Sequence, residues 1–490
     1  MTLREKTLTA VKWNLLSTLI TTSLGVILLW ALSHLLGTQQ YGVISAALVI
    51  STFCSVVLDF GISNSIVRSQ SVEKIELSSL YVINVALGVL VCVLVMGFSA
   101  QISALFKAGE MLTSQIRIMA LGFVILSFGL QPRALLTREM KFNRIAQITL
   151  ATTITNFIVA LTLAFIYHSA WCIAVAFLLS SVVNVLASGI AARSLLNYQF
   201  RFRLSAVKKH FHYGLQLVMD SLINQTSINT YPVLMSRLIS ISAIGGYNIA
   251  YSISIALFEK LNPVLSHALF PAFARISHDE SRLKASFLQV TTFSALVNFP
   301  LLMGMLLVAE PLVSVFFDAK WAFITPIIQV LCVTGAIRSL DTAVISVLLV
   351  KAKMHLNVRL GLVKLLTGMP LAYVMGQKFA LPGIVYSFLI MQLFNTLCGG
   401  LWLLRACLGE IAGAYARAVA LPVLHVLPML VVCVLLKQQT TALADYQQLA
   451  LIIITGVAVY AATIFLSPCQ TVRMFRQIAV NTVMMKRVAI

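Results

Sequence analysis

The sequence predicts an all-α polytopic membrane protein with fourteen transmembrane helices. Of its 490 residues, 60% are hydrophobic and 10% are charged, and the mean hydropathy is +0.96. No soluble fold of this size can bury so much apolar surface, so the surrounding solvent is lipid. Apolar runs of roughly 20 residues recur along the chain, and each is long enough to cross about 30 Å of hydrocarbon as a helix.

The hydropathy pattern places the spans in chain order. The first seven are expected near residues 13–36, 42–66, 80–106, 115–136, 146–167, 170–196 and 213–236. The second seven are expected near residues 244–270, 287–309, 322–350, 357–376, 381–404, 418–436 and 448–467. The connections between them are short, so none of them can hold a separate catalytic domain.

Lysine and arginine are concentrated in alternate connections. With the N-terminus inside, 26 of the 35 basic residues fall in cytoplasmic connections or tails and 6 fall outside. The other three, Lys260, Arg338 and Lys364, fall within spans. Because cytoplasmic loops carry an excess of Lys and Arg, we expect both termini to be cytoplasmic, with an uncleaved first helix. This bias explains the net charge of +20 without nucleic acid as a partner.

Two weak internal repeats relate the halves of the chain. LLTREMKFNR (135–144) resembles LLVKAKMHLNVR (348–359), and LGTQQYGVISA (36–46) resembles ISAIGGYNIAY (241–251). They predict two six-helix lobes related by pseudo-two-fold symmetry around a central cavity, which is typical of transporters. The expected domains are an N-terminal lobe, a C-terminal lobe, and the last two helices with a cytoplasmic tail: residues 1–200, 201–405 and 406–490.

Polar residues recur at helical spacing on four spans, which predicts that these spans line a cavity. On hydroxyl positions, the alternative is that the polar residues join helices by hydrogen bonds. The first span carries Asn14, Ser17, Thr18 and Thr21, and the second carries Ser51, Thr52, Ser55, Asp59 and Ser63. The seventh carries Tyr213, Gln216, Asp220, Asn224, Ser227 and Tyr231. The eighth carries Asn248, Ser252, Glu259, Asn262 and Ser266, with Lys260 on the flank of this face.

Charged residues within spans indicate function, because an Asp, Arg or Lys near the bilayer centre costs about 2.5–3.5 kcal/mol. Asp59 either faces the cavity or pairs with Arg68. Arg338 and Asp341 either act on a ligand or neutralise each other at i, i+3, and Lys364 either faces the cavity or extends to the inner interface. The sequence has no nucleophile and base constellation, P-loop or CxxC pattern, so we expect no enzyme activity, metal or cofactor.

Seven segments stand out in chain order: LREKTLTAVKW, LDFGISNSIVRS, GGYNIAY, KLNPVLSHALFPAFARI, NFPLLMGMLLVAEPLVSVFF, IIQVLCVTGAIRSL and LLVKAKM. In this order they resemble the polysaccharide-export flippases of the multidrug/oligosaccharidyl-lipid/polysaccharide superfamily, and in particular their colanic acid exporter branch. The resemblance implies a flippase that moves undecaprenyl-pyrophosphate-linked exopolysaccharide repeat units to the periplasmic leaflet of a bacterial inner membrane by alternating access. Membrane lipid, a polysaccharide polymerase and export machinery are the implied partners.

This cargo suggests roles for the polar residues. The diphosphate needs basic groups, for which Lys260 and Arg68 are the first candidates and Arg338 and Lys364 the next. The coupling candidates are Asp59, Asp220 and Glu259, although a membrane potential acting on an anionic head group needs none of them. Glu259 departs from the family pattern, which has no acidic residue before the lysine of KLNP. The candidates for binding sugar hydroxyls are Asn224, Asn248, Asn262, Gln216 and Tyr231.

The sequence is also compatible with two rival functions. A drug or cation antiporter of the same superfamily has the same fold, although such proteins usually have twelve spans. A membrane polysaccharide polymerase usually has catalytic residues on a large external loop, and the longest external loops expected here have only about a dozen residues.

Overall fold

In the computed structural model, the described part of the chain is helical and contains no strand. The described residues are 3–68, 73–196, 203–256, 273, 276, 278–351, 353–440, 442–469, 471–474 and 476–477. The chain divides into two compact units, Met1–Asn248 and Ile249–Ile490, and each has its own packing.

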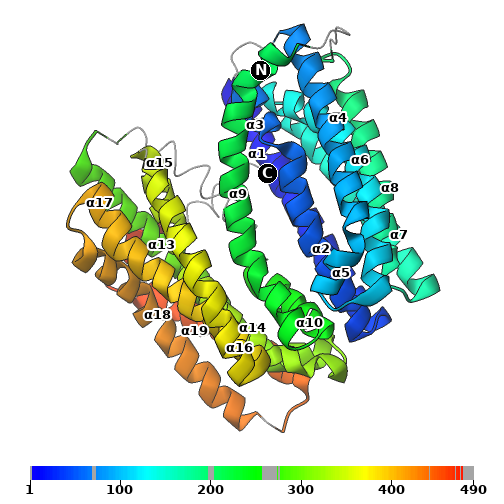
Figure 1. Cartoon of the computed structure of the whole chain (residues 1–490). Coiled ribbons are helices and arrows are strands. Elements are labelled where there is room, and N and C mark those ends of the chain that lie inside the picture. The colour runs from blue at the N-terminus through cyan, green and yellow to red at the C-terminus, as the bar shows by residue number, and fades with distance from the viewer. Residues whose placement is uncertain are drawn as a thin grey trace. The chain divides into compact units, whose positions relative to one another are not determined.

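The first unit is built around α6 (Figure 1), which packs against α2, α3, α4, α5 and α8. α1 packs against α7, and α9 packs against α2, α3 and α4. The helices are α1 (Leu3–Leu35), α2 (Thr38–Asp59), α3 (Ile62–Arg68), α4 (Lys74–Gly97), α5 (Ser99–Leu105), α6 (Gly109–Arg138), α7 (Phe142–Tyr167), α8 (Trp171–Ala192), α9 (Leu204–Leu238) and most of α10 (Ile241–Tyr251).

The second unit is built around α13, which packs against α14, α18 and α19, while α14 also packs against α16. Its elements are η1 (Ser252–Ala256), α13 (Glu280–Phe316), η2 (Ala319–Ile324), α14 (Thr325–Arg338), α15 (Asp341–Val350), α16 (Met354–Cys398), η3 (Gly399–Leu403), α17 (Leu404–Leu408), α18 (Ala412–Gln439) and α19 (Asp445–Leu466).

Asp279 defines the start of α13. Its carboxylate accepts from the Ser281 hydroxyl at 2.6 Å and from the backbone N–H of Arg282 at 3.0 Å, which satisfies a donor that the first turn leaves unpaired. These hydrogen bonds hold the pKa of Asp279 below its ordinary value. The carboxylate cap is therefore present as the charged form at neutral pH.

Eleven helical stretches of the described chain are long and apolar enough to cross a membrane. One of them, Met354–Leu408, contains the predicted spans 357–376 and 381–404, which are separated where Ala380 takes a φ of 51°. α9 is not one of the eleven, because its many polar side chains lower its hydropathy. The count of fourteen spans and the symmetry of two lobes therefore stay predictions.

The unit boundary near residue 248 lies beyond the predicted lobe boundary near residue 200. α9, the predicted seventh span, packs against α2, α3 and α4 of the first unit. It therefore belongs to the first compact unit, although the predicted lobes assign it to the second lobe. The predicted domains rest on sequence repetition and not on compactness, so they also stay predictions.

The prediction of one continuous helix over 42–66 is wrong. α2 ends at Asp59, Phe60 and Gly61 take φ angles of 41° and 68°, and α3 begins at Ile62. Two successive residues in the left-handed region cannot continue a right-handed helix, and glycine adopts that region at little cost. Hydropathy does not detect the break because both flanking segments are apolar.

Two other predicted spans are also interrupted. The span expected at 80–106 breaks at Phe98, between α4 and α5, and the span expected at 322–350 breaks at Ser339 and Leu340, between α14 and α15. In the span expected at 244–270, the α-helix changes to a π-helix at Ser252, and residues 257–270 lie outside the described residues. Hydropathy reports polarity and not backbone path, so it cannot predict these changes.

Two glycines let α2 and α10 cross closely inside the first unit. A Cβ atom on Gly42 would lie 2.1 Å from the carbonyl oxygen of Ile241, and one on Gly245 would lie 2.9 Å from the backbone nitrogen of Gly42. No side chain fits at either position, because the obstructing atoms are backbone. The crossing joins the two sequence segments, 36–46 and 241–251, that resemble each other.

Candidate functional site

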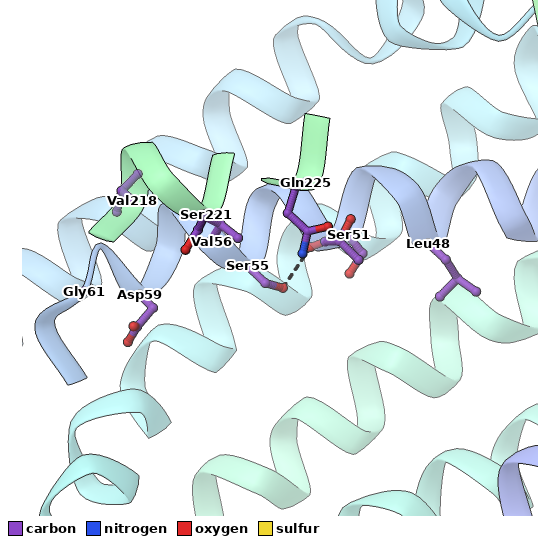
Figure 2. A pocket seen from close by; sticks show the side chains of 10 residues that line it. Leu48, Ser51, Ser55, Val56, Asp59, Gly61, Val218, Ser221 and Gln225 are labelled. Atoms are coloured by element: carbon purple, nitrogen blue, oxygen red, sulfur yellow. Dashed lines mark hydrogen bonds between the residues drawn. The ribbon is translucent and has the colours of Figure 1, made fainter. Parts of the chain in front are cut away.

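The first unit contains an open cavity of about 460 Å³ between α2 and α9. Figure 2 shows side chains of both helices around it, with Asp59 and Gly61 near one end. Its lining is mixed, with hydroxyl, amide and carboxylate groups beside aliphatic ones. The lining residues are Leu48, Ser51, Thr52, Ser55, Val56, Asp59, Gly61, Val218, Ser221 and Gln225.

Asp59 is an acidic residue that lines this cavity, and it is the last residue of α2. A negative charge at a helix C-terminus is opposed by the helix dipole, so it needs other support. Ser63, across the break in α3, donates its hydroxyl to the Asp59 carboxylate. Asp59 and Ser63 are therefore hydrogen-bonded across the break at Phe60 and Gly61. Both residues were predicted to lie on the same polar face.

The hydroxyls of α2 present acceptors to the cavity. Thr52 donates to the carbonyl of Val49 at 2.7 Å, and Ser55 donates to the carbonyl of Ser51 at 2.8 Å. Each hydroxyl has a single donor hydrogen, which stays with the helix, so toward a ligand its oxygen can act only as an acceptor. Such oxygens suit ligand groups that donate hydrogen bonds, such as sugar hydroxyls.

Gln225 and Ser221 bring α9 into the cavity, and the sequence reading did not name them. The Asn229 amide donates to the side-chain oxygen of Gln225 at 3.2 Å. Figure 2 shows the Gln225 side chain pointing toward Ser51 and Ser55. The spacing of Val218, Ser221 and Gln225 places all three on one face of the helix. This face is turned about 100° from the predicted polar face, so helical periodicity could have predicted these lining residues.

The other residues predicted on α9 and α10 are placed differently. Asn224 is exposed, and Asn248 is partly exposed on α10. Tyr231 is buried, with 5% relative exposure, and is not part of the cavity lining. The helices that carry Gln216, Asp220 and Arg68 are described, but these side chains are not, and Glu259, Lys260 and Asn262 lie outside the described residues.

A second polar cluster lies in the second unit around Asp341, the first residue of α15. Its carboxylate accepts from Gln392 at 2.8 Å, from Asn395 at 2.6 Å and from Thr396 at 3.0 Å. Gln392 also donates to the Thr396 hydroxyl at 3.1 Å. All three donors come from one face of α16, so the carboxylate joins α15 to α16.

Arg338 and Lys364 supply the positive charge of this cluster. Arg338 is the last residue of α14, three residues before Asp341, and Lys364 is on α16, the helix that supplies the donors to Asp341. These three residues are one acidic and two basic groups, so their formal charges sum to a positive value. If Arg338 and Asp341 only neutralised each other, a second basic residue, Lys364, would not be needed. A net positive charge inside a span favours an anionic ligand.

The sequence reading named Arg338, Lys364 and Asp341 but not the donors on α16. Gln392, Asn395 and Thr396 follow i, i+3, i+4 spacing on the predicted span 381–404. This spacing predicts a polar face on the span, as it does on the four spans with predicted polar faces. Their common acceptor is 51–55 residues away in the sequence and is known only from the fold.

Comparison with known proteins gives consistent likenesses. The family described as "Polysaccharide biosynthesis protein" matches residues 31–326. The lipopolysaccharide biosynthesis protein WzxC of Escherichia coli (strain K12) is 32% identical over 432 residues, which cover 88% of this chain and 88% of WzxC.

Two solved transporter structures share the fold. The lipid II flippase MurJ, in an inward closed conformation, aligns with a TM-score of 0.75 at 15% identity over 92% of this chain and 97% of MurJ. An inward-facing multidrug resistance MATE family transporter of the MOP superfamily aligns with a TM-score of 0.66 at 14% identity, over 81% of this chain and 95% of that chain. At these identities the likeness establishes the fold alone.

Proposed function

We propose that this chain, which belongs to the polysaccharide biosynthesis protein family, moves a cargo carried on undecaprenyl pyrophosphate. The protein is a polysaccharide repeat-unit flippase. The proposed movement is from the cytoplasmic to the periplasmic leaflet of a bacterial inner membrane by alternating access. The observation that carries the function is the 32% identity to WzxC over most of both chains. The protein is a transporter and not an enzyme, because its relatives are transporters.

A drug or cation antiporter of the same superfamily is the second candidate function. The fold is compatible with it, because the solved MATE family transporter has a similar fold. That likeness is at 14% identity, whereas WzxC, a lipopolysaccharide biosynthesis protein, is more than twice as similar in sequence. Function follows the binding site and not the fold, so the closer sequence likeness decides between the two.

The protein is a multi-pass membrane protein, and we propose fourteen spans with both termini in the cytoplasm. The distribution of lysine and arginine supports this orientation. The similarity of segments 36–46 and 241–251 supports two symmetric lobes, and Gly42 and Gly245 bring these two segments into close contact. The proposed lobes are residues 1–200 and 201–405, with residues 406–490 added.

The two polar sites have complementary proposed roles. The cluster of Arg338, Lys364 and Asp341 has two basic groups and one acidic group, which suits a diphosphate. Lys260 and Arg68 are each further proposed phosphate-binding groups. The cavity on α2 and α9 offers hydroxyl oxygens and the Gln225 amide, which suit the hydroxyls of a sugar. The proposed coupling groups are Asp59, Asp220 and Glu259, and a polysaccharide polymerase and export machinery are proposed partners.

Chromosomal deletion of the gene tests the proposal. The deletion strain is expected to lose its exopolysaccharide and to accumulate an undecaprenyl-linked oligosaccharide in the cytoplasmic leaflet, while its drug tolerance is unchanged. Mass spectrometry of the accumulated lipid then identifies the glycan. Lower drug tolerance with normal exopolysaccharide would instead favour the antiporter.

A further inference from the structure

The second unit has a groove of about 490 Å³ that none of the proposed transport residues lines. It lies between α13 and α18 and is closed on a third side by residues 471–474. The groove has a polar part formed by Arg417, Gln289 and Thr471, and an apolar wall that includes Leu288 and Leu421. Among its described lining residues, none is acidic.

The groove lies at one end of two membrane-spanning helices. α13 and α18 run in the same direction, because Phe287 stacks on Tyr415 near their starts, while Glu310 pairs with Lys437 at 2.8 Å near their ends. Both helices are apolar enough to cross a membrane. The groove therefore lies near the starts of both helices, next to the depth of lipid head groups.

The walls of the groove are held together beneath it. The Thr292 hydroxyl oxygen lies 3.0 Å from the carbonyl oxygen of Leu288 and 3.1 Å from that of Ala418, and its one hydrogen is shared between these two acceptors, so it connects α13 to α18. Small side chains of α18, such as Ala414, leave the space open above this contact. The groove is thus part of the helix packing.

The polar part of the groove carries positive charge and hydrogen-bond donors. The exposed Arg417 side chain is in the second turn of α18 and lines the groove. A guanidinium binds phosphate through two parallel N–H groups. The Gln289 amide donates one N–H to the Met474 sulfur at 2.6 Å, so its second N–H and the Thr471 hydroxyl are the further donors. A phosphate at this position faces no carboxylate of the groove.

We propose that this groove binds the head group of an anionic phospholipid, with its phosphate at Arg417 and its first acyl carbons against Leu288 and Leu421. Basic pockets between transmembrane helices at the cytoplasmic side are suited to such lipids, because charge and apolar contact act together. The site is separate from the cargo site and does not depend on the identity of the cargo. The proposed membrane orientation assigns it to the cytoplasmic leaflet.

Lipid retention tests the site in the full-length protein. The protein is reconstituted into vesicles of phosphatidylglycerol in excess phosphatidylcholine and extracted in mild detergent, and native mass spectrometry measures the bound lipid. The wild type is expected to retain phosphatidylglycerol in preference to phosphatidylcholine. Arg417→Gln is expected to lower the affinity about fivefold, which corresponds to ~1 kcal/mol for one basic residue at an anionic surface.

Two further variants separate the site from general charge and folding effects. Ala414→Leu fills the groove at an exposed position without changing the charge, and it is also expected to lower retention. Arg359→Gln removes a similarly exposed arginine from the second turn of α16, away from the groove, and is expected to retain lipid like the wild type. Thermal unfolding of each variant confirms that it is folded.

Three results would each overturn the proposal. One is equal phosphatidylglycerol retention by the wild type and Arg417→Gln. Another is equal retention of phosphatidylcholine and phosphatidylglycerol by the wild type. The third is displacement of phosphatidylglycerol by added undecaprenyl phosphate from the wild type but not from Arg417→Gln, which would assign the groove to the carrier lipid. None of these results depends on whether the cargo is exported.

Discussion

Among the single residues, Asp341 has three side-chain hydrogen-bond donors around its carboxylate. Asp341→Asn keeps the size of the side chain but turns an amide N–H₂ toward donors from Gln392 or Asn395. The loss of a hydrogen bond to a charged group lowers the free energy of unfolding by about 1.5–3 kcal/mol. Thermal unfolding of the purified protein in detergent measures this change.

Asp318→Asn is the matched control for that substitution. Asp318 pairs with Lys320 at 2.8 Å, and both side chains are substantially exposed, with relative exposures of 43% and 34%. Exposed ion pairs contribute only about 0–1 kcal/mol, so this variant is expected to unfold almost like the wild type. An equal loss of stability in both variants would show that the Asp341 cluster is not a structural connection.

Lys260 is the residue whose loss is expected to affect transport most directly. Lys260→Ala is expected to abolish polysaccharide export while the protein still inserts, because it removes a proposed phosphate-binding charge. Exopolysaccharide is measured in a deletion strain that expresses the variant, and immunoblotting of membranes measures its insertion. Lys320→Ala, which removes a lysine at the surface, serves as the control, and normal export by Lys260→Ala would refute the phosphate role.

For the helices, the crossing of α2 and α10 makes the sharpest prediction. In Gly42→Ala the new Cβ would lie 2.1 Å from the carbonyl oxygen of Ile241, so the helices must separate. Overpacking of this kind costs about 1–3 kcal/mol, and a lower thermal unfolding temperature is expected.

Gly25→Ala in α1 is the control for this effect of crowding. No atom lies within 4 Å of a Cβ placed on Gly25, so alanine there is expected to be neutral or to stabilise the helix by up to about 1 kcal/mol. Similar destabilisation by both substitutions would mean that glycine matters for the helices in general and not for this crossing.

For the whole molecule, the proposed orientation can be tested at two helix ends. Ser281→Cys lies at the start of α13, and Gln439→Cys lies at the end of α18, and both positions are exposed. In spheroplasts, a thiol reagent that cannot cross the membrane is expected to label Gln439→Cys only. Ser281→Cys is expected to react only after the membrane is permeabilised.

The unsubstituted protein provides the background for this labelling, because all eight of its cysteines are buried or partly buried. The opposite labelling pattern would reverse the orientation, and with it the leaflet that we assign to the phospholipid groove.

The sequence predicted much of the fold and part of the candidate site. Asp59, Ser51, Thr52 and Ser55 were predicted to face a cavity because helical periodicity relates residues on one element. Gln225 was missed because the face chosen on its helix was the neighbouring one.

The membrane class, the helical content and most span positions follow from composition and order alone, because lipid requires uninterrupted apolar helices of a certain length. Family membership also follows from the order of residues. The breaks after Asp59, at Phe98 and at Ser339, the crossing at Gly42, and the donors around Asp341 follow only from the tertiary structure. Each depends on backbone angles or on contacts between distant segments, to which hydropathy and periodicity along one helix are insensitive.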